Sequence, residues 1–141
     1  MSTRLMVNMW GLLFSLLAGS AGAEVVVVVS AQNPTKTLSH AELGDIYLGR
    51  LSRFPDGTAV VPVDQRETSP AYTEFYRYHL EKTPTQIKAH WSKLIFTGRG
   101  QPPARVANDT AMANAIAVSS RAIGYLDSTI IDERLRVVAI E

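Results

Sequence analysis

The sequence predicts an α/β protein: a single three-layer-like domain in which helices flank a small mixed sheet. Residues 25–29 form a β-branched run without polar alternation, which is typical of a strand buried on both faces. Helix-start signatures and strand-like segments then alternate along the chain. The 118 residues that follow an N-terminal export signal suffice for one hydrophobic core, not two.

Residues 1–23 have the features of a cleaved signal peptide. Arg4 supplies a positive start, residues 9–17 are apolar and uncharged, and residues 21–23 read Ala-Gly-Ala, a signal peptidase pattern. The apolar run is too short to span a bilayer, which favours a secretory signal over a membrane anchor. We therefore divide the chain into a signal peptide, 1–23, and an exported domain, 24–141, without a membrane span in its mature form.

Composition excludes several classes of function. Without Arg4 the chain has 13 basic and 13 acidic residues, and this balance argues against nonspecific binding of nucleic acid or of anionic membranes. The chain has no cysteine, so disulfides, thiolate metal sites and a lipid-modified cysteine are excluded. The three histidines lack metal-ligand spacing, and no nucleotide or hydrolase motif is present. We expect no metal, no cofactor and no catalytic residue.

The first half of the domain has clear boundaries. Asn33-Pro34 ends the first strand, and Ser39 with Glu42 forms a capping box that starts a helix for which Gly49 is a plausible stop. A turn at Asp56-Gly57 precedes a strand at 59–63. Pro62 cannot donate a ladder hydrogen bond, which predicts a sheet edge or an irregularity at that point.

The second half begins with a helix at Ser69-Pro70. Thr83 and Gln86 form another capping box, and the helix that they start has a core stripe of Ile87, Trp91, Leu94 and Ile95. Residues 96–103 are a loop by composition, 109–118 a short helix, and 122–126 and 137–140 the last strands. Trp91 and the tyrosines are expected in the core.

The turn before Ser69 is the first candidate site. A serine at the helix N-cap with Pro70 after it predicts free backbone N–H groups at Ala71 and Tyr72, where the helix dipole is positive. Arg66, Gln65 and the Thr68 hydroxyl would add charge and hydrogen bonds to an anion. The alternative is that Ser69 only caps its own helix.

A second candidate site is Gly98-Arg99-Gly100 with Arg105. Glycine lets the backbone approach a ligand, and arginine offers a bidentate fork to an oxyanion. The segment is shorter than a phosphate-loop motif, and the alternative is an ordinary solvated loop.

Four motifs in order resemble the periplasmic substrate-binding proteins of phosphate ABC transporters, the PstS-like family. Residues 26–29 leading to Asn33-Pro34 and LSHAELGDIYLGR (38–50) are similar to a strand, N-P and L-S/T-x-x-x-L-x-x-I-[FY]-x-G. DGT followed by VVPV (56–63), FTGRG (96–100) and AIGYL (122–126) resemble later family segments, so the resemblance covers roughly residues 25–140.

This resemblance implies one lobe of a type II periplasmic binding protein, a PBP-like domain, and a periplasmic location. The family's R-x-x-G-S-G-T turn corresponds to residues 66–71: Ser69 matches the serine, and Arg66 matches the arginine with a one-residue offset. Pro70 and Ala71 replace glycine and threonine. A single lobe lacks the other lobe's binding loops, so we expect weak anion binding, or a site that a partner completes.

The sequence thus predicts an exported, non-catalytic protein that binds phosphate or a similar oxyanion through Ser69, Thr68, Arg66, Ala71 and Arg99. The alternative is a module without a ligand that serves an envelope sensor or transport system, as a homodimer or with an envelope protein. A hydrolase that uses Ser69 as its nucleophile is a third, weaker hypothesis, because no histidine or aspartate spacing supports it.

Overall fold

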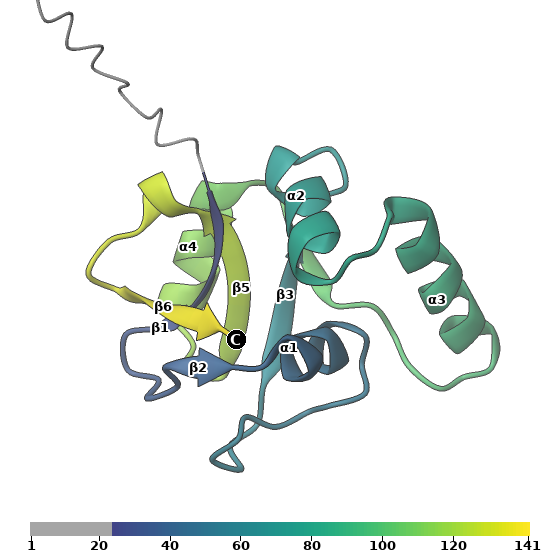
Figure 1. The fold of residues 1–141 in the computed structure, drawn as a ribbon, viewed down its shortest axis with the longest axis horizontal. Helices are drawn as coiled ribbons and strands as arrows, with labels where there is room; N and C mark the ends of the chain where they lie inside the picture. The colour runs from purple at the N-terminus through teal and green to yellow at the C-terminus, as the bar shows by residue number, and fades with distance from the viewer. Residues whose placement is uncertain (1–23) are drawn as a thin grey trace, which may run out of the picture.

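A computed structural model describes residues 24–141, and the predicted signal peptide lies outside the described residues. The order of elements is that predicted, with the short strands β2 and β4 and the 3₁₀ turn η1 in addition (Figure 1). The elements are β1 (Val25–Ser30), β2 (Thr37–Leu38), α1 (His40–Tyr47), β3 (Val61–Gln65), α2 (Pro70–His79), α3 (Pro84–Phe96), β4 (Ala104–Val106), α4 (Asp109–Ala117), β5 (Ala122–Asp127), η1 (Ser128–Ile130) and β6 (Leu135–Ile140).

The six strands form one mixed sheet in the order β2-β6-β1-β5-β3-β4. Strand β1 is antiparallel to both of its neighbours, β5 and β6. Strand β3 is parallel to β5 and to β4, and β2 is parallel to β6. The predicted α/β fold with a small mixed sheet is confirmed.

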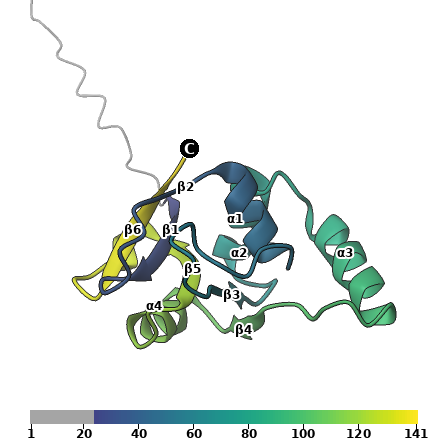
Figure 2. The same cartoon turned by 90° about the horizontal axis from the view of Figure 1, so that it is seen from below.

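Helices cover both faces of the sheet, which gives the three predicted layers. The valines of β1 alternate between two cores: Val27 and Val29 pack with α1 and α2, whereas Val28 packs with α4 (Figure 2). A strand with apolar partners on both faces has no polar positions to alternate with, which explains the uninterrupted valine run.

Local signals placed the helix starts correctly. The side chains of Ser39 and Thr83 cap α1 and α3, and both capping boxes are complete. Helix α1 ends at Tyr47, and Gly49 has a positive φ of 76°, a conformation that suits the predicted glycine stop.

Two details of the prediction are wrong. Strand β3 lies two residues further along than predicted. It is second from the edge, between β5 and β4, but its pairing with β4 begins only at Val63. At Pro62 the β4 side of the strand is unpaired, as the missing N–H predicts, so no ladder bond is lost there. Ile95 is not in the core: 55% of it is exposed, whereas Ile87 and Trp91 are buried.

Candidate functional site at the start of helix α2

The turn that precedes α2 lies where three strands end together. Strands β3, β4 and β5 are parallel, so their carboxyl ends meet at one edge of the sheet, and α2 and α4 begin at that edge. Ligands of open α/β sheets bind at such edges. The backbone N–H of Arg66 donates to the Val106 carbonyl over 3.0 Å and holds the turn against the end of β4.

Ser69 occupies the N-cap position of α2 but does not cap the helix. Its buried hydroxyl donates to Oε1 of Gln65, and its oxygen accepts no bond from the first turn. The side chains of Ser39, Thr83 and Asn108 do cap α1, α3 and α4. The interpretation of Ser69 as a plain cap is therefore wrong.

Because no side chain caps α2, a backbone N–H group in its first turn has no hydrogen-bond acceptor among the described residues. Pro70 has no N–H. The Tyr72 N–H donates to the Ser69 carbonyl over 3.1 Å, so the prediction of a free N–H at Tyr72 is wrong. The Ala71 N–H has no acceptor within residues 24–141. No acidic residue stands in the first turn, so the positive end of the helix dipole is not neutralised there.

Gln65 organises this end of the sheet. Its Nε2 donates to Oδ1 of Asp109 over 2.8 Å and to the Tyr125 carbonyl over 2.9 Å, while its Oε1 accepts from Ser69. Gln65 stands four residues before Ser69, at the exact spacing of the arginine in R-x-x-G-S-G-T. Arg66, which matches that arginine only with an offset, is exposed. The unshifted motif spacing assigns the arginine position to Gln65, which the sequence predicted only as one of the residues around an anion.

A buried carboxyl group lies beneath the turn. Asp64 accepts hydrogen bonds from the Tyr76 hydroxyl at 2.6 Å, the Gln65 N–H at 2.8 Å and the Tyr125 hydroxyl. Burial raises the pKa of Asp64, and the hydrogen bonds from Tyr125 and Tyr76 partly offset that rise. Asp64 was not among the residues predicted for the site, because its only signal in the sequence is an acidic residue near the end of an apolar strand.

Arg105 and Tyr72 complete the surroundings of the turn. Arg105 lies opposite Asp64 in the backbone register of β4 and β3. Its Nη2 lies 3.5 Å from Oε1 of Glu67, and its guanidinium carbon lies 5.7 Å from the centroid of the Tyr72 ring. The Tyr72 hydroxyl is buried and has no hydrogen-bond partner among the described residues. Burial and the charge of Asp64 raise the pKa of Tyr72 to about 12, so its phenol is a proton donor at neutral pH.

The structure brings Arg66, Thr68, Ser69 and Ala71 together, but it puts Arg99 elsewhere. Arg99 lines a pocket of about 330 Å³ between the ends of α1 and α3, and none of residues 66–71 lines that pocket. The structure therefore divides the second candidate site: Arg99 and Gly100 line this separate pocket, whereas Arg105 lies at the turn before α2.

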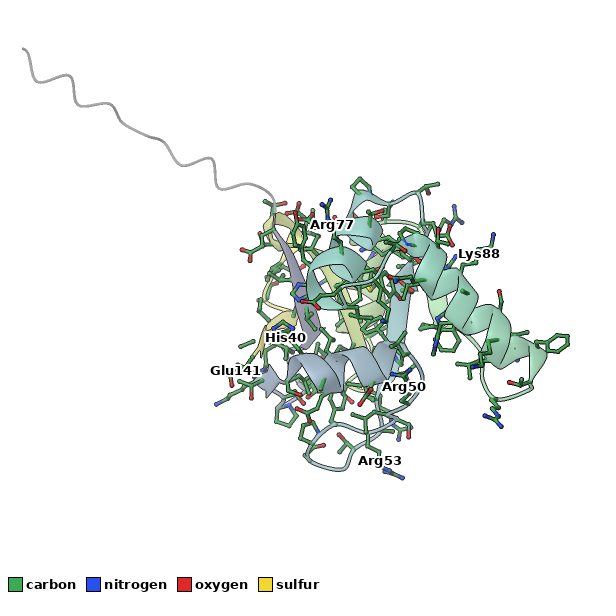
Figure 3. The ribbon with its side chains drawn as sticks, turned by 45° about the vertical axis from the view of Figure 1, so that its right-hand side comes forward. His40, Arg50, Arg53, Arg77, Lys88 and Glu141 are labelled. Carbon is green, nitrogen blue, oxygen red and sulfur yellow. The ribbon has the colours of Figure 1, made fainter. Side chains whose placement is uncertain are left out.

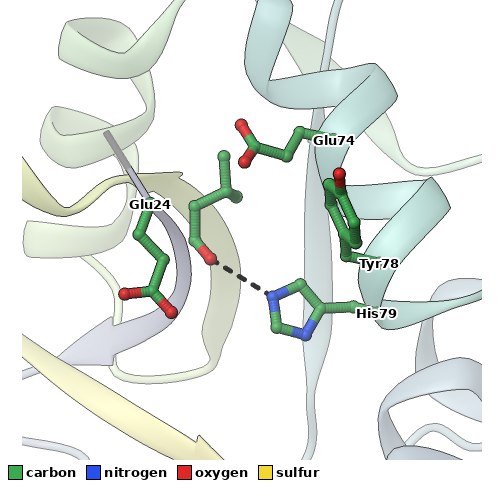
Figure 4. Close-up of a pocket in the computed structure, with 5 residues that line it drawn as sticks. Glu24, Glu74, Tyr78 and His79 are labelled. Carbon is green, nitrogen blue, oxygen red and sulfur yellow. Dashed lines mark hydrogen bonds between the residues drawn. The ribbon is translucent and has the colours of Figure 1, made fainter. Parts of the chain in front are cut away.

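Another pocket, of about 330 Å³, lies between β1 and α2 (Figure 4). Its lining includes the carboxylates of Glu24 and Glu74, and Nε2 of His79 donates to the Val25 carbonyl over 3.2 Å. The two carboxylates would repel an anion, so this pocket does not fit the predicted ligand.

Other chemistry has little support in the part of the chain that the structure describes. Residues 24–141 hold no group of three histidine, cysteine or carboxylate side chains that could bind a metal ion. The Ser69 hydroxyl bonds to Gln65 and to no imidazole within this range. No helix among these residues is both long and apolar enough to cross a bilayer.

No protein-family model matches the sequence, and a comparison with curated proteins also finds no match. Solved structures do match. A Clostridium perfringens protein described as a phosphate ABC transporter substrate-binding protein, with bound phosphate, aligns with a TM-score of 0.65 and 16% identity over 84% of this chain and 45% of that chain. PstS from Borrelia burgdorferi gives 0.64 and 12% identity over 84% and 47%. An ABC-type phosphate transport receptor from Vibrio cholerae gives 0.58 and 15% over 84% and 46%.

The chain therefore spans less than half the length of these matched structures. At this identity the likeness establishes the fold and not the ligand. The predicted resemblance is confirmed at that level: the chain has the fold of one lobe of a PstS-type phosphate-binding protein.

Proposed function

We propose that this protein is an exported, non-catalytic oxyanion-binding protein whose ligand, phosphate or a similar anion, binds at the start of α2. The observation that carries the proposal is an uncapped helix start beside a buried hydroxyl donor that lacks an acceptor. An oxyanion supplies the acceptor that both the Ala71 N–H and the Tyr72 hydroxyl lack.

Two positive charges support an anion here. Arg66 is exposed at the turn, and the one ion pair that Arg105 forms within residues 24–141 is a long, solvent-exposed contact of 3.5 Å to Glu67. Such a contact contributes little stability, so Arg105 is available to an anion. Thr68, also exposed, adds a hydroxyl at the same turn.

Two features predict that binding is weak. The Ser69 hydroxyl already donates its proton to Oε1 of Gln65, so this hydrogen bond would have to break before Ser69 could donate to a ligand. A single lobe also leaves the anion in contact with water, whereas enclosure strengthens charge interactions. We expect affinity in the millimolar range, or a partner that completes the site.

Isothermal titration of residues 24–141 with phosphate and with sulfate, at constant ionic strength, tests the proposal. We expect saturable heat, and we expect Tyr72→Phe to weaken the affinity by about five- to one-hundred-fold through loss of a buried donor. Tyr78→Phe is the matched control, because Tyr78 lies on the same helix with 65% exposure. An absence of heat, together with no shift in melting temperature at millimolar anion, would refute the proposal.

The alternative function is an interaction module without a ligand, as a homodimer or with an envelope protein. The observation that favours it is the exposed apolar end of α3, where Phe96 is 92% exposed. Light scattering and crosslinking distinguish the two functions: a monomer that binds phosphate argues for the first, and a dimer that does not bind phosphate argues for the second.

A further inference from the structure

The basic arm, residues 82–108, carries strongly unbalanced charge. It comprises α3, the loop that follows and β4, and it contains five of the 13 basic residues of the domain but no aspartate or glutamate. Lys88, Lys93 and Arg99 form no ion pair within residues 24–141. Although the total charge of the domain is near neutral, residues 82–108 therefore form a positively charged region.

Helix α3 lies at one side of the molecule and presents an exposed face (Figures 1 and 2). At about 100° per residue, the side opposite the buried Ile87 and Trp91 consists of Ala89, Ser92 and Phe96, all exposed. Lys88 and Lys93 border this face on its two sides. Phe96, at the last turn, is 92% exposed, and the neighbouring Ile95 is 55% exposed.

A cationic pocket adjoins this apolar end. The pocket between the ends of α1 and α3 is lined by three basic side chains, Arg50, Lys93 and Arg99. Arg50 lies at the end of α1, on the side that faces α3 (Figure 3). Its distance of 3.9 Å to Asp45 is a weak, exposed contact, so this charge is also available to an anionic group.

We propose that the end of α3 binds the surface of a bilayer that contains anionic phospholipids. Phe96 and Ile95 enter the interface, where apolar side chains are favoured next to a polar, cationic face. Arg50, Lys93 and Arg99 contact headgroup phosphates, and Lys88 extends its aliphatic stem along the interface while its ammonium stays among the headgroups.

A bilayer fits this surface better than a folded protein does. A stable protein interface buries roughly 800 Å² on each partner, whereas the exposed apolar group here consists of two side chains at a helix end. The near-neutral charge of the whole domain does not oppose this local binding. A membrane surface responds to charges within a Debye length, about 8 Å at physiological salt, and residues 82–108 contain five basic residues and no acidic one.

Co-sedimentation of residues 24–141 with vesicles tests the proposal. We expect binding to phosphatidylcholine vesicles that contain about one third phosphatidylglycerol, little binding to pure phosphatidylcholine, and loss of binding at about 0.5 M salt. Lys88→Glu with Lys93→Glu should lower the partition coefficient roughly thirtyfold or more. Phe96→Ser should lower it as well, through loss of apolar insertion.

Matched controls separate the arm from general charge and hydrophobicity. Lys36→Glu with Arg121→Glu makes the same charge change at exposed positions outside the arm, and Val118→Ser removes another exposed apolar side chain, with 85% exposure. Both controls should bind vesicles as the wild type does. Tyr72→Phe should too, because the α2 site plays no part in this binding.

Two outcomes overturn the proposal. The first is an absence of binding to anionic vesicles, and the second is equal weakening by the arm variants and by their controls. If the protein binds no vesicles and Phe96→Ser converts a dimer to a monomer, the surface is a self-interface. If it binds no vesicles and inorganic phosphate alone saturates the Arg50–Lys93–Arg99 pocket, the surface is a soluble anion site.

Discussion

Single residues at the end of β3 control the chemistry of the candidate site. Asp64 is a buried carboxyl group close to a site proposed for anions, and it accepts hydrogen bonds from Tyr76 and Tyr125. Burial raises its pKa, and the charge of Arg105, next to it in register, is among the contributions that partly offset this rise. The buried carboxyl group therefore anchors the turn with limited repulsion of a ligand.

The burial of Asp64 predicts a pH dependence of stability. Its pKa in the folded protein is raised above the ordinary 3.8, so the folded state retains the proton at higher pH than the unfolded chain does. Stability from this group is therefore complete below that ordinary value and is lost as pH rises through the folded-state pKa. We expect the free energy of unfolding of the wild type to fall relative to Asp64→Asn over this range in urea titrations.

Asp56 provides a control, because its pKa is shifted in the opposite direction and its effect on stability should change with pH in the opposite sense. Hydrogen bonds from Thr58 lower the pKa of Asp56, so its contribution should grow as pH rises. Relative to Asp56→Asn, the wild type should thus gain stability with pH. A wild-type advantage over Asp64→Asn that grows with pH would contradict the claim that burial dominates at Asp64.

The buried hydroxyl of Tyr72 also predicts how Tyr72→Phe changes the stability of the protein without ligand. Its hydroxyl is buried without a partner, so its removal should leave the free energy of unfolding unchanged or raise it slightly. The same Tyr72→Phe variant should lose anion affinity. Urea unfolding without anion checks this point, and a loss of more than about 1 kcal/mol would indicate that the hydroxyl has a structural partner instead.

At the scale of elements, the close contact between α4 and β5 depends on Gly124. A Cβ atom at Gly124 would overlap Sδ of Met112 and lie 2.9 Å from Cδ1 of Ile116. We expect Gly124→Ala to cost about 1–3 kcal/mol of unfolding free energy through overpacking.

Gly44, in α1, is the matched control for this substitution. Nothing lies within 4 Å of the position its Cβ would take, so Gly44→Ala should stabilise the protein by about 0.5–1 kcal/mol through helix propensity. If the two substitutions have equal effects in chemical denaturation, the tight α4–β5 packing is not what limits residue 124.

The whole molecule consists of a tightly packed body and a loosely attached helix. Strand β1 and helices α1, α2 and α4 share the two cores, whereas α3 contributes only Ile87 and Trp91 as buried residues. The Trp91 ring lies against Gly49, where a Cβ would be 3.0 Å from its Cη2. Attachment of α3 therefore depends on these two buried side chains, with Leu94 packed against the core and Nε2 of His90 bonded to the Leu48 carbonyl over 2.9 Å.

This arrangement predicts uneven local stability. Amides of α3 should exchange with solvent faster than those of β1 and β5, because α3 contributes only two buried side chains to the first core and none to the second. Trp91→Ala should accelerate exchange in α3 while it leaves protection in β1 and β5 nearly unchanged. Hydrogen exchange followed by mass spectrometry or NMR measures this, and uniform loss of protection would show that α3 belongs to the same cooperative unit.

Much of the fold could be predicted from local patterns. The valine run of β1, the capping boxes of α1 and α3 and the glycine after α1 each identify an element through interactions within a few residues. The strands β2 and β4 could not be predicted, because two- and three-residue strands exist only through their partners β6 and β3. The exposure of Ile95 also depended on how far α3 stands from the core.

The sequence by itself determined the α/β class, the boundaries of most elements, the resemblance to one lobe of a phosphate-binding protein and the location of a candidate turn at residues 66–71. Only the tertiary structure decided what that turn contains. It pairs Ser69 with Gln65, buries Asp64 beneath the turn and brings Arg105 from β4 to Tyr72, while it puts Arg99 in another pocket. The physical reason is range: caps and turns form between near neighbours in the chain, whereas burial and the approach of charges depend on which strands pair.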